Sequence, residues 1–302
     1  MDTYGVIGWP IKHSLSPAMH NAAFKALGID AEYKLFEVRP EELEDFILNK
    51  KEVAGFNITI PHKIKAKEII DNNFSVPVSK DARLIGSDLY YVELTGAINT
   101  VKRNNGNLEY WNTDAPGFLR ALKEDLKFDA KNKNALLIGC GGAGRAIIAA
   151  LSWKNINLNK LYVYELNRSQ VDAAKKYFLT LSEEWRDILE KKIEYISLEQ
   201  LPEKIKECQL LVNASPVGME KENSSPIDKK FLHKDLYVYD VVYNRETQLV
   251  KDARALFGKE HAVDGRGMLA AQGAFSFSLW INGVKPADVV GVMRKELDKA
   301  LL

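Results

Sequence analysis

The chain has 302 residues, of which 46% are hydrophobic and 27% are charged, and its formal net charge is +1. This length favours about two domains, and the composition is that of a globular protein with a sizeable core. The near-neutral charge argues against nucleic acid or a membrane surface as a partner, and two cysteines cannot build a disulfide framework or a zinc cluster. With no evident leader or membrane span, we expect a cytoplasmic protein without a metal.

Short β-rich runs alternate with helical patterns in the first part of the chain, which is typical of an α/β fold. Ser16 is expected to cap a helix that has Pro17 at its first position. Asn105-Gly106 predicts the turn of a hairpin. In chain order we expect a strand at 4–8, a helix at 16–28, a strand at 32–38, a helix at 40–50, a strand at 53–61, a helix at 62–70, a hairpin at 100–113 and a helix at 115–126.

A second α/β series follows, and the boundary between the two is expected in or near the helix at 115–126. Its predicted elements are a strand at 134–139, a helix, a strand at 161–166, one helix, strands at 194–197, 209–214 and 236–243, a helix at 247–257 and a strand at 262–265. Helical patterns at about 267–281 and 286–302 end the chain.

Residues 139–144 read GCGGAG and match the dinucleotide-binding pattern G-x-G-x-x-G. An apolar strand precedes the pattern and a helix follows it, as the pattern requires. Gly139 permits the tight turn, Gly141 lets a pyrophosphate approach the backbone, and Gly144 allows close packing of helix on strand. The free N–H groups of the helix start then favour phosphate binding. A glycine-rich turn without a ligand is the less favoured interpretation.

The second strand of such a domain usually selects the cofactor, and here its signals conflict. Glu165 lies about 20 residues beyond the glycines, where an acid binds the ribose of NAD. Arg168, in the run Asn167-Arg168-Ser169, could instead hold the 2′-phosphate of NADP. At least one of Glu165 and Arg168 is expected to be simply a surface residue. NADP(H) is favoured, and NAD(H) stays possible because of Glu165.

Other unusual polar clusters follow predicted strands, at the sheet edge where α/β proteins bind ligands. The stretches that stand out along the chain are GWPIKHSLSPAMHN (8–21), NITIPHK (57–63), GAINT (96–100), NTDAPGF (112–118), GCGGAGRA (139–146), NRS (167–169), NASPVGM (213–219), DVVY (240–243) and GRGMLAAQ (265–272). In order and spacing, nearly end to end, they resemble the motifs of the shikimate dehydrogenase family.

The resemblance implies an α/β fold of two domains, with a substrate domain of residues 1–114 plus 266–302 and a Rossmann-like NADP-binding domain of residues 115–265. It implies reversible, NADPH-dependent reduction of 3-dehydroshikimate to shikimate by a monomer or homodimer. Lys63 and Asp114 would be the catalytic pair. The implied substrate-binding residues are Ser14, Ser16, Thr59, Lys63, Asn99, Asp114, Tyr243 and Gln272. The implied cofactor-binding residues are Gly139, Gly141, Gly142, Ala143, Gly144, Glu165, Asn167, Arg168, Ser169, Ser215, Gly218, Met219 and Gly265.

The residue types suit the chemistry, because hydride delivery to a ketone builds negative charge on oxygen and calls for a proton donor. Taken singly, each residue also has a plain interpretation: Lys63 as a solvated lysine, and Ser16 and Asp114 as helix caps. Only the joint pattern favours catalysis. By the family resemblance, serine at both positions 14 and 16 looks like the enzymes that use shikimate, so shikimate is favoured over quinate as substrate.

The chain departs from the family pattern at Trp111, at Arg245, at Glu165 and in residues 87–95, which look like an insertion. Glu165 keeps an NAD-dependent quinate/shikimate dehydrogenase open as an alternative. A non-catalytic sensor of shikimate-like ligands is a less favoured one, because Lys63 and Asp114 are both present.

Overall fold

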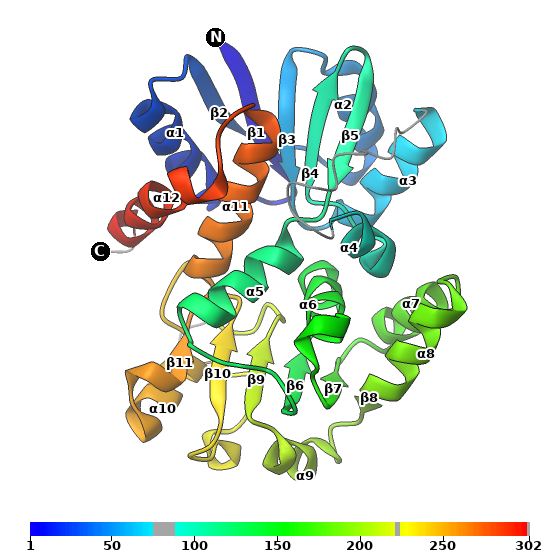
Figure 1. Cartoon of the computed structure of the whole chain (residues 1–302), viewed down its shortest axis with the longest axis vertical. Helices are drawn as coiled ribbons and strands as arrows, with labels where there is room; N and C mark the ends of the chain where they lie inside the picture. The colour runs from blue at the N-terminus through cyan, green and yellow to red at the C-terminus, as the bar shows by residue number, and fades with distance from the viewer. Residues whose placement is uncertain (75–87, 221–223, 301–302) are drawn as a thin grey trace. The chain divides into compact units, whose positions relative to one another are not determined.

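The computed structural model describes residues 1–74, 88–220 and 224–300 and divides into two compact units. Unit 1 comprises residues 1–117 and 269–302, and unit 2 comprises residues 118–268. The chain passes from one unit to the other inside α5 (Asp114–Glu124) and returns inside α11 (Arg266–Trp280). Each unit has its own sheet (Figure 1). Each also has its own buried hydrophobic residues. The predicted α/β class is therefore confirmed.

Unit 1 contains a five-stranded mixed sheet in the order β2-β1-β3-β4-β5. Strands β1, β2 and β3 run parallel, and β4 and β5 form the antiparallel hairpin that Asn105-Gly106 predicts, with positive φ at both turn residues. The remaining elements of this part are β1 (Asp2–Gly8), α1 (Ser16–Leu27), β2 (Ala31–Glu37), α2 (Leu43–Asn49), β3 (Val53–Ile58), α3 (Lys63–Asn73), α4 (Asp88–Thr95), β4 (Thr100–Asn104), β5 (Asn107–Trp111) and α12 (Pro286–Ala300).

Helices cover both faces of this sheet (Figure 1). Tyr4 and Val6 of β1 face a cluster with α1, α11 and α12, whereas Ile7 faces the opposite cluster with α2, α3 and α4. Alternate residues of a strand point to opposite faces, so a strand buried on both sides reads as a continuous apolar run. This explains why the first apolar run of the chain could be assigned to a strand.

Unit 2 contains a six-stranded parallel sheet in the order β11-β10-β9-β6-β7-β8. This is the strand order of a dinucleotide-binding Rossmann fold, in which the first strand is β6. The elements are β6 (Asn134–Ile138), α6 (Gly142–Ser152), β7 (Lys160–Tyr164), α7 (Arg168–Phe178), α8 (Glu183–Lys192), β8 (Ile193–Ile196), α9 (Leu201–Lys204), β9 (Leu210–Asn213), β10 (Tyr237–Asp240), α10 (Gln248–Phe257) and β11 (Ala262–Val263).

Several element predictions need correction. Ser16 is the first residue of α1 and not its cap, because Leu15 already has helical dihedrals and occupies the cap position. The single helix expected between the strands at 161–166 and 194–197 is two helices, α7 and α8. The helix expected at 40–50 begins with a 3₁₀ turn at Pro40–Glu42, and the short α9 was not predicted. Residues 88–95 form α4, whereas residue 87 of the departing segment lies outside the described residues.

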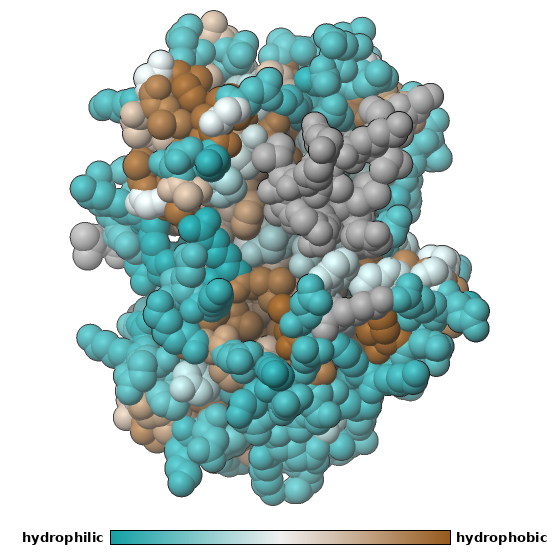
Figure 2. Space-filling model, viewed as in Figure 1, coloured by the Kyte–Doolittle hydropathy of each residue, from teal (hydrophilic) through white to brown (hydrophobic). Residues whose placement is uncertain are grey.

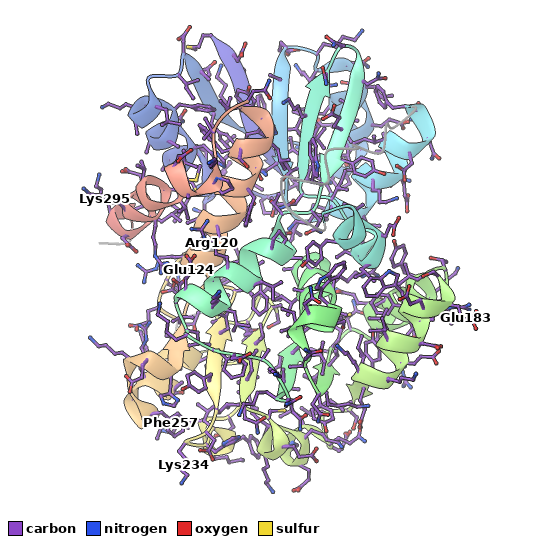
Figure 3. All side chains as sticks on the ribbon, in the orientation of Figure 1. Arg120, Glu124, Glu183, Lys234, Phe257 and Lys295 are labelled. Carbon is purple, nitrogen blue, oxygen red and sulfur yellow. The ribbon has the colours of Figure 1, made fainter. Side chains whose placement is uncertain are left out.

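The surface of the visible face is mostly hydrophilic (Figure 2), in keeping with the charged fraction of 27%. Some of its charged residues stabilise helices by local pairs. Arg120 and Glu124 lie one turn apart on α5 (Figure 3), and the Nε of Arg120 is 3.0 Å from Oε1 of Glu124. Such an exposed i, i+4 pair contributes about 0.3–0.5 kcal/mol to helix stability. No described helix is long and apolar enough to span a membrane.

Candidate active site

The first polar loop of unit 1 connects β1 to α1. Its backbone turns so that Ser14 Oγ accepts the N–H of Ser16 at 3.3 Å, and Ser16 itself is buried. This bond satisfies one of the N–H groups that a helix start leaves unpaired. Ser14 and Ser16 therefore both lie at the start of α1, where further backbone N–H groups and the helix dipole favour an anion.

Thr59 follows β3 and lies beside the same loop. Because β1 and β3 are parallel neighbours, their carboxyl ends reach the same edge of the sheet. A Cβ at Gly8 would lie 2.5 Å from the Thr59 methyl carbon, so glycine at position 8 is what allows this approach. The structure thus brings Thr59 next to the first loop.

Lys63 opens α3 and forms an ion pair with Asp114, the first residue of α5. The side chains are only 12% and 8% exposed. Burying a charge is unfavourable unless a partner and hydrogen bonds compensate it, so a buried pair of this kind needs a supporting structure. It has one: Asn99 Nδ2 donates to Asp114 Oδ1 at 2.9 Å, and Lys63 contacts the other carboxylate oxygen.

Asn112, rather than Asp114, provides the side-chain cap of α5. Its Oδ1 accepts the N–H groups of Asp114 and Ala115 at 3.2 and 3.3 Å. The capping alternative for Asp114 is therefore wrong, and the carboxylate of Asp114 is left to Lys63 and Asn99. Sequence reasoning missed this role, although an asparagine two residues before a helix start is a recognisable capping signal.

Gln272 of α11 completes this group. Its Oε1 lies 3.3 Å from Asn99 Nδ2, and a Cβ at Gly117 of α5 would lie 2.9 Å from the Gln272 Cβ. The absence of a side chain at Gly117 therefore lets α11 approach the start of α5. Trp111, one of the departures from the family pattern, is buried at the end of β5, and its carbonyl accepts the N–H of Asn99 at 3.0 Å. The structure brings Lys63, Asn99, Asp114 and Gln272 together.

In unit 2, the glycine pattern lies between β6 and α6 as predicted. Gly139 has φ of 102°, and a Cβ there would lie 2.7 Å from the backbone of Ala214 and Ser215. A Cβ at Gly144 would lie 2.3 Å from the Gly139 carbonyl oxygen, so this glycine lets the helix pack against the turn. A Cβ at Gly141, in contrast, would meet only Gln170, at 3.4 Å.

The backbone at Gly141 is accessible to a dinucleotide, because Gln170 is the one described residue that a Cβ there would meet within 4 Å. Gly141 is the cap residue of α6, and Gly142 and Ala143 are its first helical residues, with no side chain capping them. A pyrophosphate binds to free N–H groups in this arrangement. The donor set therefore fits a dinucleotide, and the residues that would hold its phosphates are Gly141, Gly142 and Ala143.

Glu165 does not point into free solvent. One carboxylate oxygen accepts the N–H of Cys140 at 2.7 Å, and the other accepts the N–H of Asn167 at 2.8 Å. The carboxylate therefore links the glycine turn to the loop after β7. This link is a second role for the residue that the sequence offered as an NAD signal, and it depends on backbone groups that sequence patterns do not reveal.

The loop after β7 leads into α7. The Oδ1 of Asn167 caps this helix by accepting the N–H of Ser169 at 3.1 Å, and it also accepts the Ser169 hydroxyl at 2.7 Å. Arg168 is the first residue of α7 and is exposed, and no ion pair to another described residue is found for it. A free guanidinium at a helix start suits an anion such as a phosphate.

Residues 214–219 form the loop after β9, which ends at Asn213. Asn213 Oδ1 accepts both the N–H and the hydroxyl of Ser215, and its Nδ2 donates to the Val217 carbonyl at 3.1 Å and to Asp240 at 2.9 Å. Gly218 has φ of 95°, and Met219 is 39% exposed. The side chain of Asn213 therefore determines the path of this loop.

Asp240 at the end of β10 anchors Asn213. Burial raises the pKa of Asp240 to about 6, although hydrogen bonds from Thr247, the Val242 N–H and Asn213 oppose that rise. Neither Asp240 nor Asn213 was predicted as a site residue, although both lie in motifs that the sequence displays. Their buried pairing across neighbouring strands could not be read from the motifs alone.

Tyr243 and Gly265 also belong to unit 2. Burial raises the pKa of the Tyr243 phenol. A Cβ at Gly265 would lie 2.0 Å from the Val241 carbonyl oxygen, so packing of the chain after β11 requires glycine there. Among the residues that the structure describes, no group of three or more histidine, cysteine, aspartate or glutamate side chains could hold a metal ion.

Comparison with known proteins gives a consistent result. Residues 6–87 match the family described as the shikimate dehydrogenase substrate binding domain. A curated relative, shikimate dehydrogenase (NADP(+)) of Methanopyrus kandleri, is 37% identical over 293 residues, which cover 95% of this chain and 92% of that protein.

Solved structures agree over the whole chain. Shikimate 5-dehydrogenase of Thermus thermophilus in complex with NADP(H) and shikimate is 30% identical, with a TM-score of 0.76 and coverage of 98% of this chain and 100% of that one. Quinate dehydrogenase of Corynebacterium glutamicum in complex with NAD is 28% identical, with a TM-score of 0.79 and coverage of 99% of each chain. Together with the sequence matches, these similarities establish that the chain belongs to the shikimate dehydrogenase family.

Proposed function

We propose that this protein is a shikimate dehydrogenase that reversibly reduces 3-dehydroshikimate to shikimate with NADPH. The observation that carries the proposal is the buried Lys63–Asp114 ion pair with Asn99 and Gln272 around it. The same chain has a parallel sheet with a dinucleotide-binding glycine turn, which supports a redox reaction rather than binding alone.

In the proposed reaction, the bound nicotinamide cofactor supplies the hydride, and the residues of unit 1 handle the proton. As the substrate carbonyl carbon gains the hydride, its oxygen becomes negative, and the Lys63 ammonium donates a proton to it. Asp114 holds the ammonium and accepts a hydrogen bond from Asn99. In the reverse direction, Lys63 accepts the proton of the substrate hydroxyl.

Unit 1 also has the groups that this substrate needs. Its carboxylate would bind to the hydroxyls of Ser14 and Ser16 and to the N-terminus of α1. As the family resemblance implies, Thr59, Asn99 and Gln272 would bind the ring hydroxyls, and Tyr243 would lie near the substrate carboxylate. Serine at both loop positions supports shikimate, whose ring carries fewer groups than quinate.

For the cofactor, we propose that Arg168 binds the 2′-phosphate of NADP and that Glu165 mainly shapes the loops. Each Glu165 carboxylate oxygen already accepts a backbone N–H, which reduces its value as a ribose acceptor. The residues proposed to line the cofactor site are Gly139, Gly141, Gly142, Ala143, Gly144, Glu165, Asn167, Arg168, Ser169, Ser215, Gly218, Met219 and Gly265.

An NAD-dependent quinate/shikimate dehydrogenase is the second candidate, and the similarity to a quinate dehydrogenase in complex with NAD favours it. Steady-state kinetics with NADP⁺ and NAD⁺, each against shikimate and quinate, separate the two. We expect the highest kcat/KM for shikimate with NADP⁺. Efficient turnover of quinate with NAD⁺ and little use of NADP⁺ would instead identify the second candidate.

Two further expectations from the sequence stay predictions: a location in the cytoplasm, and a monomeric or homodimeric state. Cell fractionation tests the first and analytical ultracentrifugation of the purified chain tests the second. A species larger than a dimer at micromolar concentration would contradict the latter.

A further inference from the structure

We propose that Thr100 and Ser276 are positioning residues that fix the orientation of Asn99 and, through it, of the Lys63–Asp114 pair. This inference rests on the proposed dehydrogenase activity. The two residues belong to a buried group of five side chains, here called the hydroxyl–amide network: Asn57, Asn99, Thr100, Thr113 and Ser276. Thr100 opens β4, and Ser276 lies on α11 one turn after Gln272.

The contact between Thr100 and Ser276 is short, with 2.7 Å between the two hydroxyl oxygens. Asn57 Nδ2 donates to Ser276 Oγ at 2.9 Å and to the Asn99 carbonyl at 3.0 Å. Ser276 Oγ also lies 3.1 Å from Thr113 Oγ1. The network therefore ties β3, β4 and the residues before α5 to one position on α11.

The orientation of the Asn99 amide follows from its neighbours. The backbone N–H of Thr113 can only donate, and it lies 2.7 Å from Asn99 Oδ1. The opposite flip would set two donors against each other there and two oxygens against each other at Asp114. Asn99 must therefore present its NH₂ group to Asp114 Oδ1, at 2.9 Å.

The Thr100 hydroxyl supports this orientation, and the Thr113 hydroxyl contacts both ends of the amide. Thr100 Oγ1 lies 3.1 Å from Asn99 Oδ1, the amide atom that does not bond to Asp114, whereas Thr113 Oγ1 lies 2.9 Å from Asn99 Nδ2 and 3.2 Å from Asn99 Oδ1. Loss of the Thr100 hydroxyl would leave buried amide hydrogens of Asn57 with one acceptor fewer. Asn99 could then tilt, and the carboxylate that holds Lys63 would follow.

Ser276 secures the same geometry from α11. Its hydroxyl lies 2.9 Å from the Gln272 carbonyl of the preceding turn, so the bonds to Thr100 and Asn57 also fix the register of Gln272. That register brings Gln272 Oε1 to within 3.3 Å of Asn99 Nδ2. Small displacements of catalytic groups reduce kcat strongly, which gives both residues a measurable effect without substrate contact.

The test compares Thr100→Val with Thr100→Ser in the full-length enzyme. Valine keeps the shape of threonine and removes the hydroxyl, whereas serine keeps the hydroxyl. We expect Thr100→Val to lower kcat for shikimate oxidation by about tenfold or more, with the KM for NADP⁺ unchanged, and Thr100→Ser to retain most of the wild-type kcat. Thr3→Val, which removes a hydroxyl at the start of β1, is the matched control and should leave kcat unchanged.

Circular dichroism shows whether each variant folds. If Thr100→Val does not fold, the second variant, Ser276→Ala, tests the positioning role instead. We expect it to lower kcat by a similar factor. Wild-type kcat in a folded Thr100→Val or Ser276→Ala, or an equal loss in Thr100→Ser, would overturn the inference while leaving the proposed function intact. A wild-type chain that oxidises no shikimate with NADP⁺ would overturn the proposed function and, with it, this inference.

Discussion

Asn112 caps the helix that Asp114 begins, by accepting the Asp114 backbone N–H on its side-chain oxygen at 3.2 Å. A helix start normally engages its first acidic or polar side chain as the cap. Because a neighbouring residue performs that function here, the Asp114 carboxylate is free to hold Lys63. Asp114 can therefore begin α5 and pair with Lys63 at the same time, because Asn112 supplies the side-chain cap.

The first prediction concerns the proton donor. Lys63→Ala should lower kcat by about 10²–10⁴-fold and change KM much less, because general acid catalysis acts in the transition state. Steady-state oxidation of shikimate by NADP⁺ measures it. Lys65→Ala is the matched control on the same helix, since Lys65 is 65% exposed and pairs only locally with Glu68. An unchanged kcat in Lys63→Ala would remove Lys63 from the role of acid.

The second prediction concerns cofactor choice. Arg168→Ala should raise the KM for NADP⁺ about 10- to 100-fold and leave that for NAD⁺ nearly unchanged, because a hydrogen bond to a charged group contributes about 1.5–3 kcal/mol. Lys176→Ala, which removes another exposed cation of α7, should change neither. Equal changes for both cofactors would show that Arg168 does not recognise the 2′-phosphate.

The third prediction separates packing from phosphate binding within one loop. Gly144→Ala should destabilise the fold by about 1–3 kcal/mol, because the new Cβ would lie 2.3 Å from the Gly139 carbonyl oxygen. Gly141→Ala should keep the wild-type Tm, since the nearest atom to its Cβ is 3.4 Å away, but should weaken NADP⁺ binding. Calorimetric unfolding and titration with NADP⁺ measure the two effects. Undiminished NADP⁺ affinity in Gly141→Ala would argue against phosphate binding there.

The fourth prediction concerns acid stability. His20 is fully buried against Tyr33, with ring centroids 4.2 Å apart, and burial lowers its pKa to about 3. Below the unfolded pKa of about 6.5, the unfolded chain binds a proton that the folded chain does not, so stability falls as the pH is lowered from about 6.5 towards 3.

His20→Phe should remove that dependence while keeping the aromatic stacking. Between pH 7 and pH 4.5, the wild type should lose about 2–3 kcal/mol more unfolding free energy than the variant. Urea unfolding at both pH values measures the difference, and the exposed His13→Asn serves as control. An identical pH dependence in wild type and His20→Phe would rule out His20 as the source.

Much of this molecule could be predicted from its sequence, because its elements follow strong local patterns. The Asn105-Gly106 turn, the glycine turn before α6 and the alternation of strands and helices all depend on neighbouring residues. The structure also joins Lys63 to Asp114, as the family resemblance implies. The break between α7 and α8 was missed because amphipathic periodicity continues on both sides of it.

The parts that could not be predicted depend on partners far away in the chain. Glu165 carries a strong local signal for binding ribose, yet its actual hydrogen bonds are to the Cys140 and Asn167 backbone. A side-chain rotamer of this kind depends on where a distant turn presents its N–H. The hydroxyl–amide network is similar, because threonine in a strand and serine in a helix have no local pattern that would indicate a shared hydrogen bond.

The bond between Asn57 and Ser276 joins residues separated by 219 positions. A ribosome making this chain completes unit 2 at residue 268, so the region that holds Lys63 gains Gln272 and Ser276 only after all of unit 2 has been made. Long-range contacts of this kind form late and slow the folding of the region that needs them. A nascent chain that ends before residue 269 would thus contain all of unit 2 but a unit 1 without Gln272 and Ser276.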